Sequence, residues 1–347
     1  MIERIWFGAD RPSRAARAAL MPAERVFAGV SGLRTLLYDA GWVKGRSVTI
    51  PVVSVGNINV GGSGKTPIAA WIARWLRDHG AHPAIVMRGY GEDEPLVHRT
   101  VNADIPVVTG ADRAAAVEEA VTRGADIAVL DDGFQHRQLQ RDVDLVVVSA
   151  DQWTDEVRLL PAGPWREPLS AVRRASMVIV TRKAATERQV DRVNEVIARV
   201  AARVPRMTVH LAPDELIRVG GMERVPMTAL NDEQVTVVAA IGDPPAFFRQ
   251  IESHARAIHP IAFRDHHRFS PADVSRIVNE ASGSARVVGT LKDAVKLRDL
   301  WPRGAPGLWY VSQRVVVERG VGGLEQLLEG ALRARSTPNS PAASGPG

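Results

Sequence analysis

The chain has 347 residues, 45% of them hydrophobic, which is enough to bury a sizeable core and suggests about two domains. It has no cysteine, which excludes disulfides, zinc–thiolate sites, iron–sulfur clusters and a thiol nucleophile. The net charge of +5 favours acidic partners such as nucleic acid, anionic lipid headgroups or a phosphorylated substrate, and no apolar run reaches the roughly 18 residues of a membrane span.

The N-terminal segment, residues 1–46, is predicted to be helical over residues 13–43, with a break near Pro22. It holds eight basic and four acidic residues, with Trp6 and Trp42 near its two ends. This pattern is typical of an amphipathic helix in a bilayer interface, although a helical hairpin packed on the core fits it equally well. Because charged residues interrupt the segment, we do not expect a signal peptide, and we expect a cytoplasmic protein.

Residues 47–220 show apolar runs that alternate with helical patterns. We predict strands at 48–55, 84–87, 127–130, 145–148 and 177–180, and crossover helices at 67–79, 111–123 and 187–204. Runs without polar alternation indicate strands buried on both faces. The segment is therefore predicted to be a doubly wound α/β nucleotide-binding core with a mainly parallel sheet.

A second set of elements, residues 221–335, is predicted to form a smaller α/β domain. Its expected strands lie near 235–240, 258–263, 287–288 and 308–311, and its expected helices near 246–255, 271–281 and 324–333. Residues 336–347 are rich in Ser, Pro, Ala and Gly, and we expect them to be a disordered tail.

A phosphate-binding loop directly follows the first predicted strand and opens a helix. Its glycines let backbone N–H groups turn toward phosphate, while Lys65 can reach the β- and γ-phosphates and Thr66 can offer its hydroxyl to Mg²⁺. Asn59 stands where the strict motif has glycine, and asparagine tolerates a left-handed backbone better than most residues. The predicted nucleotide-binding residues are Asn59, Gly61, Gly62, Ser63, Gly64, Lys65, Thr66 and Pro67.

Two adjacent carboxylates, Asp131 and Asp132, follow another predicted strand, at the sheet edge where ligands bind. One of them can hold Mg²⁺ directly or through water, and the other can position the metal or a substrate hydroxyl. Residues 181–184 lack the aspartate with which guanine-nucleotide readers recognise their base. The expected nucleotide is therefore ATP.

Several segments together resemble the tetraacyldisaccharide 4'-kinase family of the lipid A pathway over residues 20–330. The run 131–136, Asp-Asp-Gly-Phe-Gln-His, is the most specific of them when it accompanies a phosphate loop followed by proline. The others are Ser54-Val55-Gly56-Asn57, Arg88-Gly89-Tyr90-Gly91, Asp93-Glu94-Pro95, Arg141-Asp142, residues 160–164, Arg166-Glu167-Pro168, Asp265-His266-His267 and residues 292–297.

The resemblance implies a P-loop NTPase-like fold and transfer of the γ-phosphoryl group of ATP, with Mg²⁺, to the 4'-hydroxyl of a tetraacylated glucosamine disaccharide 1-phosphate. The product would be the 1,4'-bisphosphorylated lipid A precursor. It also implies a peripheral protein on the cytoplasmic face of the bacterial inner membrane, in contact with the lipid surface. We expect no nucleic-acid partner and no obligate protein partner.

Carried onto this sequence, the resemblance implies that Asp93 is the general base and that His266 orients it. Arg166 would stabilise charge on the transferring phosphoryl group. Glu167 would assist at the metal, so the predicted metal ligands are Thr66, Asp131, Asp132 and Glu167. The predicted substrate contacts are Arg88, Arg113, Gln135 and His136.

Two other functions remain open at this point. A nucleotide switch that recruits a partner to the membrane would need the phosphate loop but neither Asp93 nor His266. A kinase of a soluble small molecule would act without lipid. The sequence departs from the family in the stretch before Asp93, which is shorter than usual, and at Leu291, where the family usually has glutamate.

Overall fold

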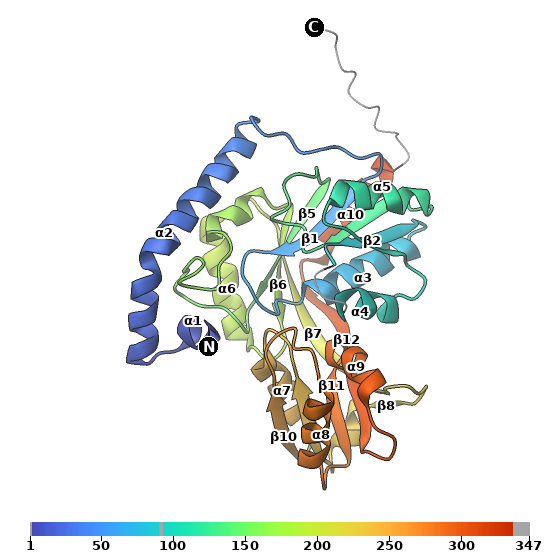
Figure 1. The fold of residues 1–347 in the computed structure, drawn as a ribbon. Coiled ribbons are helices and arrows are strands. Elements are labelled where there is room, and N and C mark those ends of the chain that lie inside the picture. Colours follow the sequence, from blue (N-terminus) through green and yellow to red (C-terminus); the bar gives the residue numbers. More distant parts are fainter. Residues whose placement is uncertain (1, 90–92, 336–347) are drawn as a thin grey trace.

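The structure, a computed structural model, describes residues 2–89 and 93–335. Tyr90, Gly91 and the tail predicted at 336–347 lie outside the described residues. Within these bounds one sheet of 12 strands runs through the molecule in the order β10-β9-β11-β12-β7-β6-β5-β1-β4-β2-β3, and β8 pairs with β7 (Figure 1).

The first half of the sheet is a buried parallel core, as the apolar runs predict. Its paired strands are β1 (Val52–Asn57), β2 (Pro83–Met87), β3 (Val107–Thr109), β4 (Ile127–Asp131), β5 (Val143–Ser149) and β6 (Met177–Arg182). The helices of this half are α3 (Lys65–Asp78), α4 (Asp93–Val101), α5 (Arg113–Thr122) and, after β6, α6 (Glu187–Val200), with a 3₁₀ turn at Leu169–Arg174. The prediction missed α4 altogether.

Two long antiparallel strands, β7 (Arg206–Arg218) and β12 (Gly307–Arg319), join this core to the second half. The prediction gave β12 as residues 308–311 and did not include β7. Both strands mix buried with exposed residues along their length, and the apolar run of β12 at 308–311 covers only part of that strand. Through them a single sheet continues across both halves.

The second half holds the remaining elements (Figure 1). Its strands are β8 (Arg224–Pro226), β9 (Gln234–Ala239), β10 (Ala257–Ala262) and β11 (Arg286–Thr290). Its helices are α7 (Pro244–Glu252), α8 (Pro271–Glu280) and α9 (Leu291–Leu297), with 3₁₀ turns at Met227–Leu230 and Arg298–Leu300. Strands β9, β10 and β11 pair in parallel, so this half is also α/β.

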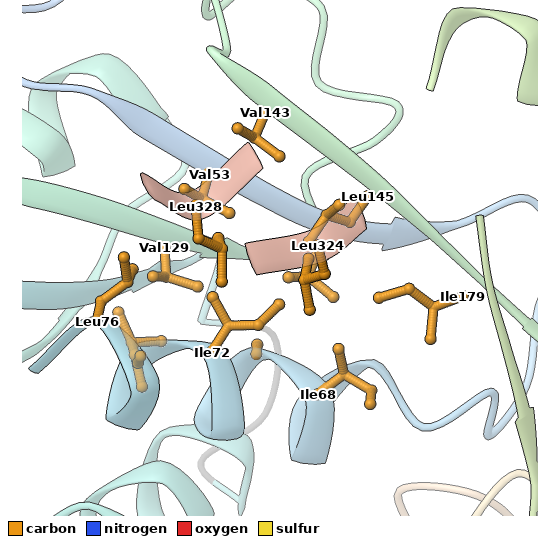
Figure 2. Close-up of a cluster of buried hydrophobic side chains, with 14 of the residues drawn as sticks. Val53, Ile68, Ile72, Leu76, Val129, Val143, Leu145, Ile179, Leu324 and Leu328 are labelled. Atoms are coloured by element: carbon orange, nitrogen blue, oxygen red, sulfur yellow. The ribbon is translucent and has the colours of Figure 1, made fainter. Parts of the chain in front are cut away.

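The last helix, α10 (Val321–Ala334), returns to the first half and packs on its core. Figure 2 shows Leu324 and Leu328 of α10 among Ile68 and Ile72 of α3 and Val53 of β1. Each of these side chains is buried, and burial of a side chain of this size stabilises the fold by about 1.5–3 kcal/mol. The last helix, α10, and the first helix of the core, α3, thus pack together against β1.

The N-terminal segment forms α1 (Ile2–Phe7) and α2 (Arg11–Asp39), and α2 lies along one flank of the core (Figure 1). The break predicted near Pro22 is wrong, because α2 continues through it. A proline inside a helix costs about 3 kcal/mol. Just beyond it, α2 is held to the core, because the Glu24 carboxylate accepts a hydrogen bond from the Leu159 backbone at 2.7 Å and pairs with Arg158. Among the described helices, none combines the length and apolar content needed to cross a membrane.

Candidate active site

The phosphate-binding loop lies between β1 and α3, and buried contacts hold its shape. Asn57 Nδ2 donates to Ser63 Oγ at 3.0 Å, and Thr181 Oγ1 donates to the Ser63 carbonyl at 2.8 Å. Gly64 has a φ of +88°, and a Cβ there would lie 2.4 Å from Leu211 Cδ1, so only glycine fits. Helix α3 begins at Lys65, which places its N-terminal N–H groups at the loop, where they can bind phosphate.

Asn59 is not in the left-handed backbone conformation that the motif comparison suggested. Among the described non-glycine residues, only Asp132 and His266 have positive φ. Asn59 forms a β-bridge with Trp165, and this pairing requires an extended backbone. Asn59, which replaces the motif glycine, therefore connects the phosphate loop to the segment that contains Arg166 through this β-bridge.

Asp132 pairs with two cations in the site. Its carboxylate lies 3.4 Å from Lys65 Nζ, and Arg166 Nη1 donates to both of its oxygens at 3.1 Å. Burial raises the pKa of Asp132, but Lys65 and Arg166 outweigh burial and lower this pKa to about 2. Asp132, Lys65 and Arg166, all predicted site residues, thus lie together beside the start of α3.

Asp131, Thr66 and Glu167, the other predicted metal ligands, are all buried. The Oδ1 atom of Asp131 has no hydrogen-bond partner among the described residues, as a carboxylate that faces a cation would. Glu167 instead pairs with Arg174 at 2.6 Å and accepts from Gln135 at 3.1 Å. Mg²⁺ at nucleotide sites uses one or two carboxylates together with phosphate oxygens, and Thr66, Asp131 and Asp132 fit that requirement.

Asp93 and His266 come from different halves of the molecule and meet in the site. Asp93 is the first residue of α4 and only 5% exposed, and its Oδ2 atom lies 3.3 Å from Nδ1 of His266. Burial raises the pKa of Asp93, but the close contact with His266 and the charges of Lys292 and Lys296 lower it to about 2. The same contact with the Asp93 carboxylate raises the pKa of His266.

The pH dependence of stability gives a test of this pair. The pKa of Asp93 falls from 3.8 to about 2 on folding, which adds stability above about pH 4 that is lost as the pH falls toward 2. The pKa of His266 rises above 6.5, which adds stability below about pH 6.5 that is lost as the pH rises through the raised value. His266→Gln should therefore lower the thermal midpoint most between about pH 4 and 6.5. A difference that is constant from pH 4 to 9 would contradict the pairing.

The predicted substrate contacts lie around the acidic pair. Gln135 Nε2 donates to the Asn57 carbonyl at 2.6 Å. Burial, together with Arg113 and other arginines nearby, lowers the pKa of His136 to about 4, so His136 is neutral at pH 7. Arg113 is itself buried, and Arg88 is close enough to lower the pKa of Arg113 further. Arg113 thus brings a buried positive charge close to Asp132.

Two cavities meet at Arg166. The larger, of about 900 Å³, is lined by the phosphate loop, by Glu94 and by residues of the second half that include His266 and Lys292. The smaller, of about 290 Å³, is lined by Phe27, Val30, Ser31, Arg34 and Thr35 of α2 and by Gln135, Arg137, Arg166, Glu167 and Arg174. Arg166 is therefore the described site residue that faces both cavities.

Several residues of the site carried no signal that single-sequence reasoning could use. Lys292 pairs with Glu94 at 2.7 Å across the two halves, and Lys296 lies 3.9 Å from Asp93. Gly242 packs on the phosphate loop so closely that a Cβ would lie 2.6 Å from the Gly62 nitrogen, and its carbonyl accepts from Gln152. The two lysines stand within the segment 292–297, but their spacing alone does not show what they face.

Comparison with known proteins gives consistent matches over most of the chain. The family described as Tetraacyldisaccharide-1-P 4'-kinase matches residues 16–103 and 92–333. A protein named tetraacyldisaccharide 4'-kinase from Anaeromyxobacter sp. (strain K) is 36% identical and covers 97% of both chains. A protein of the same name from Halorhodospira halophila is 35% identical over 88% of this chain and 90% of its own.

One solved structure is also similar. It is the LpxK protein from Aquifex aeolicus, described as an "apo" form in complex with ATP, and it superposes with a TM-score of 0.70 at 26% identity. The match covers 91% of this chain and 99% of that one. Both halves of the present molecule therefore have counterparts in a single known architecture.

Proposed function

Because the chain belongs to the tetraacyldisaccharide-1-P 4'-kinase family, we propose that Asp93 accepts the proton of the acceptor's 4'-hydroxyl as that oxygen attacks the γ-phosphorus of ATP. The chain is an ATP-dependent kinase of tetraacyldisaccharide 1-phosphate. The observation that carries the proposal is the Asp93–His266 pair, at 3.3 Å beside the cavity that contains the phosphate loop.

The remaining residues bind the nucleotide and Mg²⁺ or stabilise charge on the transferring phosphoryl group. The loop N–H groups and Lys65 bind the phosphates, and Thr66, Asp131 and Asp132 would hold Mg²⁺, which neutralises charge on the β- and γ-phosphate oxygens. Arg166 exchanges its pairing with Asp132 for the transferring phosphoryl group. His266 keeps the Asp93 carboxylate ionised and oriented.

The two halves, residues 47–220 and 221–335, act as lobes whose approach assembles the site. His266 and Lys292 belong to the second lobe, and Asp93 and Glu94 to the first. Both contacts are formed in this structure, and lobes held together by them over bound nucleotide would exclude water, which would otherwise hydrolyse ATP.

The acceptor site is proposed to lie under α2, in the smaller cavity. Arg34 and Arg137 bring positive charge there for an anionic saccharide, and Arg166 connects the cavity to the nucleotide. Val26, Val30, Leu33 and Leu36 of α2 are all more than half exposed, at helical spacing. This apolar stripe would rest in the cytoplasmic face of the inner membrane, so that the acyl chains of the acceptor can stay in the bilayer.

Vesicle binding tests the role of the stripe. Val26→Glu combined with Leu33→Glu should weaken binding to anionic phospholipid vesicles by about tenfold or more, because each side chain loses about 1.5–3 kcal/mol of apolar transfer. The measurement is co-sedimentation. Leu300→Glu combined with Val321→Glu is the matched control, since it places the same charges at exposed apolar positions outside α2. Equal binding by the two double variants would refute the proposed membrane surface.

A further inference from the structure

A second histidine–carboxylate pair connects α4 to β4, and its histidine has no part in the proposed proton transfer. His98 of α4 and Asp131 at the end of β4 are 0% and 2% exposed. The Nε2 atom of His98 lies 2.9 Å from Oδ2 of Asp131. Because an ionised carboxylate can only accept a hydrogen bond, Nε2 carries the proton. The contact therefore fixes one oxygen of Asp131 and leaves the other free.

The free oxygen is the feature that needs an explanation. Oδ1 of Asp131 is buried and has no hydrogen-bond partner among residues 2–89 and 93–335. A buried anion that is only half satisfied costs stability unless a cation completes its environment. Thr66, in the first turn of α3, is buried as well, and Asp132 is the next residue along the chain. The free oxygen suits Mg²⁺ that arrives with the nucleotide, bound directly or through water.

Helix α4 is bonded at both of its ends to parts of the site. In its first turn Asp93 contacts His266 and Glu94 contacts Lys292 of the other half, the latter at 2.7 Å. Five residues after Asp93, His98 bonds to Asp131. The helix thus spans the distance between the proposed base and the acidic pair beside the phosphate loop. Its position depends on contacts at both places.

We propose that His98 is a positioning residue for the Mg²⁺–ATP site, and the inference rests on the proposed function of Asp93 and Asp131. His98 turns the free oxygen of Asp131 toward the metal, and it holds α4 so that Asp93 keeps its place relative to the phosphates. It touches neither substrate. Outer hydrogen-bond partners of metal-binding carboxylates act in this way, and their loss typically costs about 10–100-fold in metal affinity or activity.

The test measures how ATP binding depends on Mg²⁺ when no acceptor is present, by isothermal titration calorimetry. His98→Leu removes the donor and should raise the Mg²⁺ concentration for half-maximal enhancement of ATP binding about 10–100-fold. Its affinity for ATP without Mg²⁺ should equal that of the native chain. His98→Gln can place an amide donor near the former Nε2 position and should recover most of the Mg²⁺ response, whereas the shorter His98→Asn should not.

Leu96→Ala, at a half-buried position of the same helix outside both cavities, is the control for general loosening of α4, and its Mg²⁺ response should be native. A folded His98→Leu variant with the native Mg²⁺ response overturns the proposal. If His98→Leu does not fold, the test is the comparison of His98→Gln with His98→Asn. Equal Mg²⁺ responses of these two variants overturn the proposal. Because no acceptor is used, these results are independent of whether the chain phosphorylates the lipid.

Discussion

Replacing Asp93 with asparagine is expected to lower the turnover of phosphoryl transfer by about 10²–10⁴-fold and to leave ATP affinity unchanged. The amide matches the carboxylate in shape but cannot take the proton of the attacking hydroxyl. The Asp93 carboxylate, with its pKa lowered to about 2, is ionised at neutral pH, and it can accept the proton once the attacking hydroxyl becomes acidic as its bond to phosphorus forms. Steady-state kinetics in mixed micelles gives the turnover number, and calorimetry gives the affinity for ATP.

The chain offers a matched control for this substitution in a neighbouring histidine–carboxylate pair. Asp273 lies 3.1 Å from His267, and its pKa is also lowered to about 2, first by hydrogen bonds from Ser270. Asp273 lies at the start of α8 and lines neither of the two cavities. Asp273→Asn should therefore cost stability at the helix cap but little turnover. If Asp93→Asn stays within a few-fold of the native turnover, Asp93 is not the base.

Removal of the Arg166 side chain is expected to have an effect of similar size. Arg166→Ala should lower turnover by about 10³-fold or more, because an arginine that stabilises charge on a transferring phosphoryl group contributes about 10³–10⁵-fold. The arginine lines both cavities and already pairs with the carboxylate next to Lys65. The loss should appear in kcat more than in the KM for ATP, since the charge develops in the transition state.

Two further variants sharpen this result. Arg166→Lys keeps the charge but loses the two-pronged geometry, so it should recover only part of the rate. Arg173→Ala removes an exposed arginine of the same segment whose Nε donates to the Val200 carbonyl, away from both cavities, and it should behave as native. Full recovery by lysine would show that Arg166 supplies charge alone. A native rate for Arg166→Ala would remove it from the mechanism.

The sequence predicted best those features that depend on neighbouring residues alone. The buried runs of β1, β4 and β5 identify a parallel core, because such strands must be apolar on both faces. The order of glycines before Lys65 identifies a phosphate loop, because backbone geometry requires them there. The acidic pair at the end of β4 follows from the rule that ligands bind at the carboxyl edge of such a sheet.

Features that depend on distant residues could not be predicted in this way. His98 is a histidine in a short helix with no local mark of its role, and only its approach to Asp131 shows one. Helix α2, which continues through Pro22, is held to the core by Glu24, whose partner Leu159 lies 135 residues later in the sequence. Asp93 and His266 are paired by the resemblance, whereas the residues alone gave no reason to bring them together.

The most direct test of the central claim is to identify where the label of γ-labelled ATP goes when the native chain is incubated with Mg²⁺ and tetraacyldisaccharide 1-phosphate in mixed micelles. The account predicts label on the 4'-oxygen of the lipid, with little released as inorganic phosphate. Label that appears only as inorganic phosphate, or not at all while ATP binds, would contradict the assignment of Asp93 as the base for an acceptor hydroxyl.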